Sequence, residues 1–199
     1  MEKSIITLPE PQKDLTFPLM KALEKRRTLR RWKDTSLSMQ ELSNLLWAAC
    51  GITKEKQGKI KSKRTAPSAC NSQEIRVYVL LKEGAFFYDE EQHALIEIVP
   101  KDIREHVGTQ KMMKTAPVGL VFVADLSRMR SPLFRSEEAQ RFCAWVDTGY
   151  ISQNIYLYCA AANLATAALA LIKRDKLHSQ MNLQEHEKIV LTQVVGHPE

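Results

Sequence analysis

Glycine is scarce in this 199-residue chain, which contains only seven. None of the seven falls in a G-x-G-x-x-G or G-x-x-x-x-G-K-[S/T] pattern, where backbone amides approach nucleotide phosphates closely. The sequence therefore argues against a Rossmann dinucleotide fold and against a P-loop. A G-x-S-x-G turn is also missing, so the chain lacks the nucleophile elbow of the α/β-hydrolases.

Metal-ligand patterns are equally absent. The four cysteines (Cys50, Cys70, Cys143 and Cys159) are widely spaced without a C-x-x-C pair, and the five histidines form no H-x-x-x-H. This spacing argues against a zinc site and against a disulfide framework, and it predicts reduced thiols and no metal. An enzyme without a metal or a catalytic triad usually takes its reactivity from an organic cofactor.

Export and membrane signals are missing as well. Met1–Thr7 lacks the basic, apolar and cleavable series of a signal peptide, and no run approaches the roughly 18 apolar residues that cross a bilayer. Together with reduced thiols, these features predict a cytoplasmic protein without a membrane partner. The possibility that an export leader was removed from the chain remains open.

Positive charge is what the sequence has in excess, with a net charge of +6 and a pI of about 9.1. It gathers in Lys25–Arg31 and in Lys54–Arg64. A nucleic-acid-binding module would account for both runs, but neither contains an aromatic residue that stacks on bases, and no zinc-finger or zipper pattern is present. We therefore favour a small phosphorylated ligand for the first run, and expect no nucleic acid partner.

The apolar content of 44% predicts one domain over residues 1–199, with residues 1–15 as an extended N-terminal arm. Hydrophobic periodicity predicts a helix from Thr16 to Arg26 that buries Leu19 and Leu23. A capping box at Ser38 and Glu41 predicts a second helix that ends at Gly51.

The rest of the chain contains both strands and helices. We expect a mobile loop at 53–64, strands at 75–81, 86–88, 118–124, 166–172 and 189–195, a short helix at 101–106 and two helices at 136–145 and 147–164. The last helix is apolar on nearly every side, so it is predicted to be buried all round, in a core or at a subunit interface. Because strands and helices mix without strict alternation, the predicted fold class is α+β.

The first of three notable segments is R-R-T-L-R at Arg26–Arg30, directly after a predicted helix. It resembles the R-R-S-x-R signature of the nitroreductase family of FMN enzymes. That resemblance implies that Arg26, Arg27 and Thr28 bind the phosphate and ribityl end of FMN, while Arg30 reaches the N1/C2=O edge of the flavin. A solvated basic helix end would have a similar composition.

The second segment is A-P-S-A-C-N-S-Q at Ala66–Gln73, about 40 residues after the arginines. It resembles the P-S-x-x-N-x-Q loop of the same family, which packs over the FMN held mainly by the other subunit of a homodimer. The resemblance assigns cofactor contacts to five residues of this loop: Pro67, Ser68, Ala69, Asn71 and Gln73. An unrelated turn before a strand would also favour proline, serine and asparagine.

The third segment runs from D-T-G-Y-I-S-Q-N at Asp147 to A-N-L-A-T-A-A-L-A-L-I at Ala162–Ile172. The family has a long interface helix here, followed by a G-L-G turn and a strand that faces the flavin. By resemblance, Leu169 and Ala170 contact the flavin. Both expected glycines are missing, but Asn163 tolerates the left-handed conformation that such a turn requires. The V-G-H-P tail is similar to that of short, SagB-like members.

The resemblance implies a mixed, mostly antiparallel sheet flanked by helices, in an intertwined homodimer with two shared FMN sites. The implied function is hydride transfer from NADH or NADPH, through flavin N5, to a small acceptor such as a nitroaromatic or a quinone. Arg30 is the implied catalytic residue, because it would stabilise negative charge on the flavin. Two alternatives stay open: a SagB-like dehydrogenase of peptide azolines, and a non-catalytic flavin-storage protein.

Overall fold

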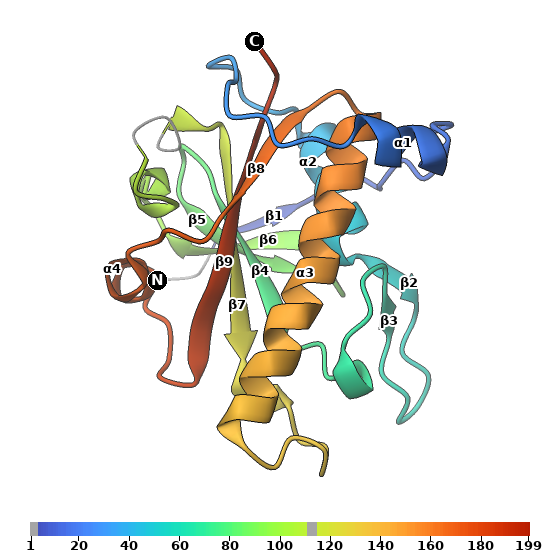
Figure 1. Ribbon diagram of the computed structural model, residues 1–199, viewed down its shortest axis with the longest axis vertical. Coiled ribbons are helices and arrows are strands. Elements are labelled where there is room, and N and C mark those ends of the chain that lie inside the picture. The colour runs from blue at the N-terminus through green and yellow to red at the C-terminus, as the bar shows by residue number, and fades with distance from the viewer. Residues whose placement is uncertain (1–3, 111–114) are drawn as a thin grey trace.

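Seven antiparallel strands form the central sheet of the computed structural model, which describes residues 4–110 and 115–199 (Figure 1). In spatial order the strands are β1 (Ile5–Thr7), β6 (Ala94–Val99), β5 (Ala85–Asp89), β4 (Ile75–Leu80), β7 (Val118–Asp125), β9 (Glu187–Gly196) and β8 (Ala165–Leu169). Two short strands, β2 (Ile52–Lys54) and β3 (Lys63–Arg64), pair separately as a hairpin. Every strand pair among the described residues is antiparallel, so the parallel component of the expected mixed sheet is not found there.

Helices flank this sheet, which confirms the predicted α+β class. They are α1 (Leu19–Lys25), α2 (Met39–Cys50), α3 (Glu137–Ala161) and α4 (Arg174–Gln180), with 3₁₀ turns η1 (Ala69–Asn71), η2 (Arg104–His106) and η4 (Leu126–Arg128). Figure 1 shows α3 crossing one face of the sheet, with α1 near one end and η1 near the other. Within the described residues, no helix combines the length and apolar character that crossing a membrane requires.

Strand β7 is the centre of the core and is buried at every position. Its side chains alternate between two apolar clusters, so Leu120 and Phe122 pack on the side of α2 and α3, while Val121 and Val123 pack on the opposite side with Leu177 of α4. Because both faces of the sheet are covered here, the sequence of β7 is apolar at successive positions and does not alternate between apolar and polar residues.

Helix α2 begins and ends where the sequence predicts. The Ser38 side chain accepts the Glu41 backbone N–H, and the Glu41 carboxylate accepts the Ser38 backbone N–H at 2.7 Å, which completes the capping box. At the other end, a Cβ on Gly51 would lie 2.2 Å from Trp47 Cδ1, so a larger residue would collide with the indole ring.

Helix α3 corrects one expectation. The two helices predicted at 136–145 and 147–164 are one continuous 25-residue helix, which begins after the N-cap Ser136 and ends at Ala161. In the single chain Tyr150 is 46% exposed, and Phe142 and Trp145 before it are 65% and 62% exposed, so burial of this face at a subunit interface stays a prediction. Periodicity located the apolar residues but did not show which of them this chain itself covers.

Several smaller expectations are also revised. Helix α1 begins at Leu19 rather than Thr16, and it leaves Leu19 and Leu23 exposed instead of buried. Residues 52–64 contain the β2–β3 hairpin rather than a plain loop. The N-terminal arm contributes β1 to the sheet edge beside β6, a strand that sequence periodicity did not predict.

We predict that Gly119→Ala destabilises the fold by roughly 1–3 kcal/mol, the range for overpacking a core. A Cβ at this central β7 position would lie 2.5 Å from Cγ1 of Val107 and 3.4 Å from Cβ of Leu80. Denaturant unfolding of the variant measures the loss. Adding Val107→Ala removes the colliding methyl group and should recover part of it; a purely additive double variant would contradict the steric explanation.

Candidate functional site

The basic segment after α1 lies in an extended path along the edge of the sheet. The Leu29 backbone N–H donates to the Thr166 carbonyl of β8 at 3.0 Å, and the Lys33 N–H donates to the His197 carbonyl at 2.9 Å. Trp32 is buried, with its Cβ close to where a side chain on Gly196 would stand. These contacts fix the backbone on both sides of Arg30 while its side chain stays exposed.

Tyr156 of α3 organises this segment, and sequence reasoning did not identify it. Its hydroxyl accepts the Ala168 backbone N–H at 3.0 Å and lies 3.0 Å from the Thr28 hydroxyl. The Arg26 guanidinium lies over the same ring, 5.5 Å from its centroid. One aromatic side chain thus connects α3, β8 and the basic segment. The sequence carries no signal for this role, because Tyr156 is one of several aromatic residues on a long helix.

The three arginines remain available to an anion. Arg27 is exposed, and its Nε–H donates to the nearby Lys25 carbonyl at 3.2 Å. Neither Arg26 nor Arg30 forms a salt bridge with a described carboxylate. A hollow of about 230 Å³ opens beside the segment; its lining includes Lys25, Arg27, Tyr156 and Asn163. The charge and the space suit a phosphate group.

The end of β8 follows Thr166 and Ala168, which contact Leu29 of the basic segment and Tyr156. Leu169 is buried and Ala170 is exposed just beyond the strand. Asn163, in the turn before β8, has φ +55°, which confirms the prediction that asparagine adopts the left-handed conformation at this turn. The predicted positions 26–30 and 169–170 therefore belong to one region, connected through the contacts of Thr166 and Ala168.

The Pro67–Gln73 loop has an unusual backbone. Cys70, Asn71 and Gln73 have φ values of +53°, +51° and +53°, a region that non-glycine residues rarely occupy. Such a conformation persists only where surrounding contacts enforce it. Here the Ala69 N–H donates to the Asp147 carboxylate of α3 at 2.8 Å, and the Gln73 N–H donates to Ser68 Oγ at 3.0 Å.

Two of the predicted cofactor contacts on this loop make internal contacts. Gln73 is buried and its amide nitrogen donates to the Ser62 carbonyl at 2.8 Å. The Asn71 amide nitrogen donates to the same carbonyl at 3.1 Å. Pro67 and Cys70 are exposed instead, so they form the accessible surface of the loop. Sequence reasoning assigned no role to Cys70.

A buried carboxyl group lies directly beneath the loop. Asp147 is 3% exposed, and burial together with the neighbouring Glu74 carboxylate raises its pKa to about 7, although the Ala69 N–H acts in the opposite direction. Glu74 is fully buried at the start of β4. Neither carboxylate was predicted as a functional residue, because an isolated acidic residue in sequence does not show its burial.

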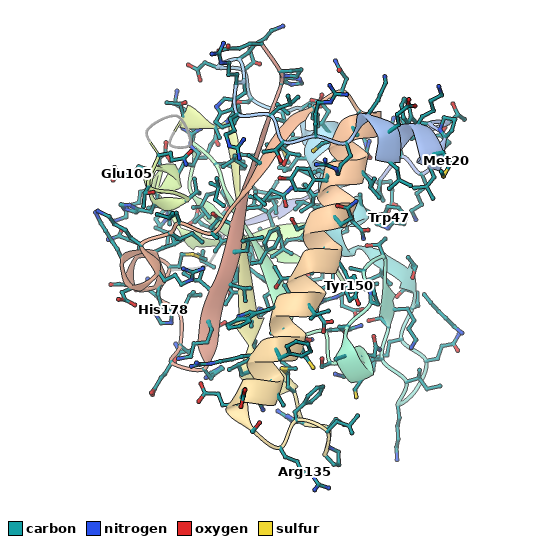
Figure 2. The ribbon with its side chains drawn as sticks, in the orientation of Figure 1. Met20, Trp47, Glu105, Arg135, Tyr150 and His178 are labelled. Atoms are coloured by element: carbon teal, nitrogen blue, oxygen red, sulfur yellow. The ribbon has the colours of Figure 1, made fainter. Side chains whose placement is uncertain are left out.

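The two predicted halves of the site are separated within one chain. The basic segment contacts α3 at Tyr156, whereas the Pro67–Gln73 loop contacts it at Asp147. These attachment points are nine residues apart, about 13 Å along a helix. Figure 2 shows the helix between them with its side chains, including the labelled Tyr150. Within one chain the two halves are therefore attached to α3 about two and a half turns apart.

A larger hollow of about 470 Å³ lies between α3 and β9. Its floor is apolar, and Arg141, Arg174 and Lys188 contribute to its wall. Arg174 is partly engaged, because its guanidinium donates to the carbonyls of Ile189 and Val190. No cluster of three or more metal-ligating side chains occurs in residues 4–110 and 115–199.

The chain is similar to known proteins over nearly its whole length. A family model described as the nitroreductase family matches residues 23–197. A Ralstonia eutropha structure named provisionally as a nitroreductase has a TM-score of 0.89 and 35% identity, over 98% of this chain and 90% of that one. A protein of Methanocaldococcus jannaschii with the same kind of provisional name is 24% identical, over 94% of this chain and 93% of its own length.

A third relative was crystallised with its cofactor. The Desulfovibrio desulfuricans protein, also named provisionally as a nitroreductase, is in complex with FMN. It has a TM-score of 0.64 and 20% identity, over 92% of this chain and 87% of that one. At this identity the similarity concerns the fold.

We predict that Tyr156→Phe loosens the basic segment and costs roughly 1–2 kcal/mol, because the Ala168 N–H and the Thr28 hydroxyl lose their shared partner. Amide hydrogen exchange at Leu29 and denaturant unfolding measure the two effects. Tyr150→Phe is the matched control, since that side chain lies on the same helix and is half exposed. Equal behaviour of the two variants would show that Tyr156 does not organise the segment.

Proposed function

Because this chain belongs to the nitroreductase family, we propose that it is an FMN-dependent oxidoreductase that passes hydride from NADH or NADPH to a small acceptor such as a nitroaromatic or a quinone. The observation that carries this proposal is the basic segment, whose backbone is fixed on β8 while Arg26, Arg27 and Arg30 remain free of carboxylate partners among the described residues.

The residues present fit a flavin mononucleotide. The phosphate of FMN is close to a dianion, and guanidinium groups with a hydroxyl bind such a group through charge-assisted hydrogen bonds of about 1.5–3 kcal/mol each. Arg26, Arg27 and Thr28 supply these donors. Arg64 illustrates the contrast, since it is buried and already paired with Glu90. The sheet also lacks the glycine-rich turn that would bind the adenylate half of FAD.

Bound FMN would supply the hydride-accepting atom and pass the electrons on to the acceptor. The chain's own contribution is orientation and charge stabilisation. Arg30, which is exposed one residue after the backbone contact of Leu29 with β8, would stabilise negative charge at the N1/C2=O edge of the flavin. Ala170, exposed at the end of β8, would present its backbone to the ring.

Completion of the site requires a second copy of the chain in this proposal. The Pro67–Gln73 loop of one subunit would cover the cofactor held by the basic segment of its partner. Exposed apolar side chains on α1 and α3 support such an assembly: Leu19, Met20, Phe142, Trp145 and Tyr150 are between 46% and 74% exposed. A soluble monomer avoids an apolar surface of this kind.

We predict that Arg30→Ala retains FMN but slows its anaerobic reduction by NADH or NADPH by roughly 10²- to 10³-fold, the cost of removing one charge-stabilising donor. Arg26→Ala should mainly weaken FMN retention, because it removes a phosphate ligand. Stopped-flow reduction of FMN-saturated variants and flavin release on denaturation measure the two properties.

The matched control for charge is Arg31→Ala, an exposed arginine one residue further along the same segment. It should change neither property. If Arg30→Ala is reduced as fast as the parent protein, the catalytic assignment of Arg30 is wrong. A protein that binds FMN without any turnover would instead be a flavin store.

We predict that Phe142→Glu dissociates the dimer and releases FMN at the same time, because it places a charge on the exposed apolar face of α3. Light scattering should show a parent mass of about twice the 22.7 kDa chain and a variant of single-chain mass. Ile5→Glu is the control, since Ile5 is 58% exposed on β1, at the edge of the sheet opposite β8. A monomeric variant that keeps FMN tightly bound would contradict the shared site.

A further inference from the structure

The buried carboxyl groups of Glu74 and Asp147 lie where the Pro67–Gln73 loop meets α3. In addition to burial, the Glu74 side chain raises the pKa of Asp147 through its charge and through a hydrogen bond, which two ionised carboxylates could not form because they carry only acceptor atoms. Glu74 is 0% and Asp147 3% exposed, so bulk solvent screens their charges little. A proton on one of the two carboxyl groups would allow this hydrogen bond, because a protonated carboxyl group is a donor.

The surrounding donors are too few for two ionised groups. Asp147 Oδ2 receives the Ala69 N–H, and Glu74 Oε2 lies 2.6 Å from the Ser72 hydroxyl. That hydroxyl is also 2.7 Å from the Ala69 carbonyl, and it has a single hydrogen to donate. Glu74 Oε1 is buried without a hydrogen-bond partner among the described residues. A proton carried by Asp147 would satisfy that oxygen.

Neighbouring charges do not neutralise the pair. Lys61 faces Glu74 from the hairpin side and donates to the Ser72 carbonyl at 3.2 Å, not to a carboxylate. Arg64 also faces Glu74, but it is paired with Glu90. On the other elements, the thiol of Cys143 on α3 faces the pair, and the thiol of Cys70 on η1 lies near Cys143. Neither thiol supplies positive charge.

We propose that Glu74 and Asp147 share one proton, and that this protonated pair holds the Pro67–Gln73 loop against α3 in the conformation that covers the flavin of the partner subunit. The covering role rests on the function proposed above, whereas the proton-dependent attachment of the loop rests on this chain alone. Both carboxyl groups are positioning residues, because neither reaches the surface of the loop.

The attachment acts at both ends of the strained turn. Asp147 holds the loop before the left-handed residues through Ala69, and Glu74 follows Gln73 directly and holds Ser72. Left-handed geometry at Cys70, Asn71 and Gln73 costs free energy and needs such contacts to persist. Repulsion between two ionised carboxylates would separate the two attachment points.

The direction of the pH dependence follows from burial. Burial and the Glu74 charge raise the pKa of Asp147 from 3.8 to about 7 in the folded chain. Between pH 3.8 and about pH 7 the folded state therefore binds more protons than the unfolded state. The stabilisation of the folded state by the Asp147 proton is fully present below pH 3.8. It is lost as the pH rises through about 7. The loop should be held at pH 6 and released at pH 8.5.

Hydrogen exchange at the Ala69 amide tests the attachment without cofactor. Asp147→Asn is the matched variant, because the amide can accept the Ala69 N–H and donate to Glu74 at every pH. We expect equal exchange of wild type and variant at pH 6, and about tenfold faster exchange of the wild type at pH 8.5. The ratio of the wild-type exchange rate to the variant exchange rate, taken at each pH, cancels the intrinsic chemical exchange rate of the Ala69 amide, because residues 68 to 70 are the same in both proteins.

Two further variants complete the comparison. Glu74→Gln can also donate permanently across the pair, so it should reproduce the pH-independent exchange of Asp147→Asn. Glu138→Gln removes an exposed carboxylate from the same helix and should behave as wild type. The infrared band of a protonated carboxyl group should appear at pH 6 in the wild type and be lost in Asp147→Asn. A constant exchange ratio between pH 6 and pH 8.5 would overturn the proposal.

Equilibrium dialysis of FMN separates the two claims. Wild-type affinity should weaken about tenfold between pH 6 and pH 8.5 relative to Asp147→Asn, because the released loop no longer covers the partner's cofactor. If exchange depends on pH but FMN affinity does not, the shared proton stands and the covering role of the loop is wrong. If neither preparation binds FMN, the proposed function fails while the exchange result still decides the attachment.

Discussion

Helix α3 is the constraint on which the rest of the site depends. It is a single rigid rod across the sheet, and it anchors the basic segment through Tyr156 and the Pro67–Gln73 loop through Asp147. Because these contacts are separated by more than two helical turns, the helix keeps the two segments apart within one chain. The same helix presents exposed apolar side chains, and this is the surface on which we propose that a second copy completes the site.

Local signals in the sequence predicted most of the fold. The Ser38 capping box and Gly51 delimit α2 by short-range hydrogen bonding and sterics, and the apolar run at 118–124 corresponds to the central strand β7. The continuity of α3 and the pairing of β1 with β6 were missed, because each depends on tertiary contacts. Periodicity likewise marks the apolar faces of α3 but not what covers them.

The site was predicted by resemblance, and its supporting residues were not predicted at all. Arg26, Thr28 and the Ala66–Gln73 loop are recognisable because their spacing resembles a known family. Tyr156, Glu74 and Asp147 act through burial and mutual contact, which one sequence does not record. Their roles are apparent only when the fold brings α3 against segments about 70 to 130 residues away in sequence.

The central claim is that each cofactor site uses the basic segment of one subunit and the loop of the other. Mixing two defective chains tests it: Arg26→Ala, which weakens the phosphate contact, and Cys70→Trp, which fills the exposed surface of the loop. Each variant alone should hold little FMN. After denaturation together and refolding, one intact site per mixed dimer should restore about a quarter of the parental flavin content. Recovery no greater than the average of the two separate variants would contradict the account.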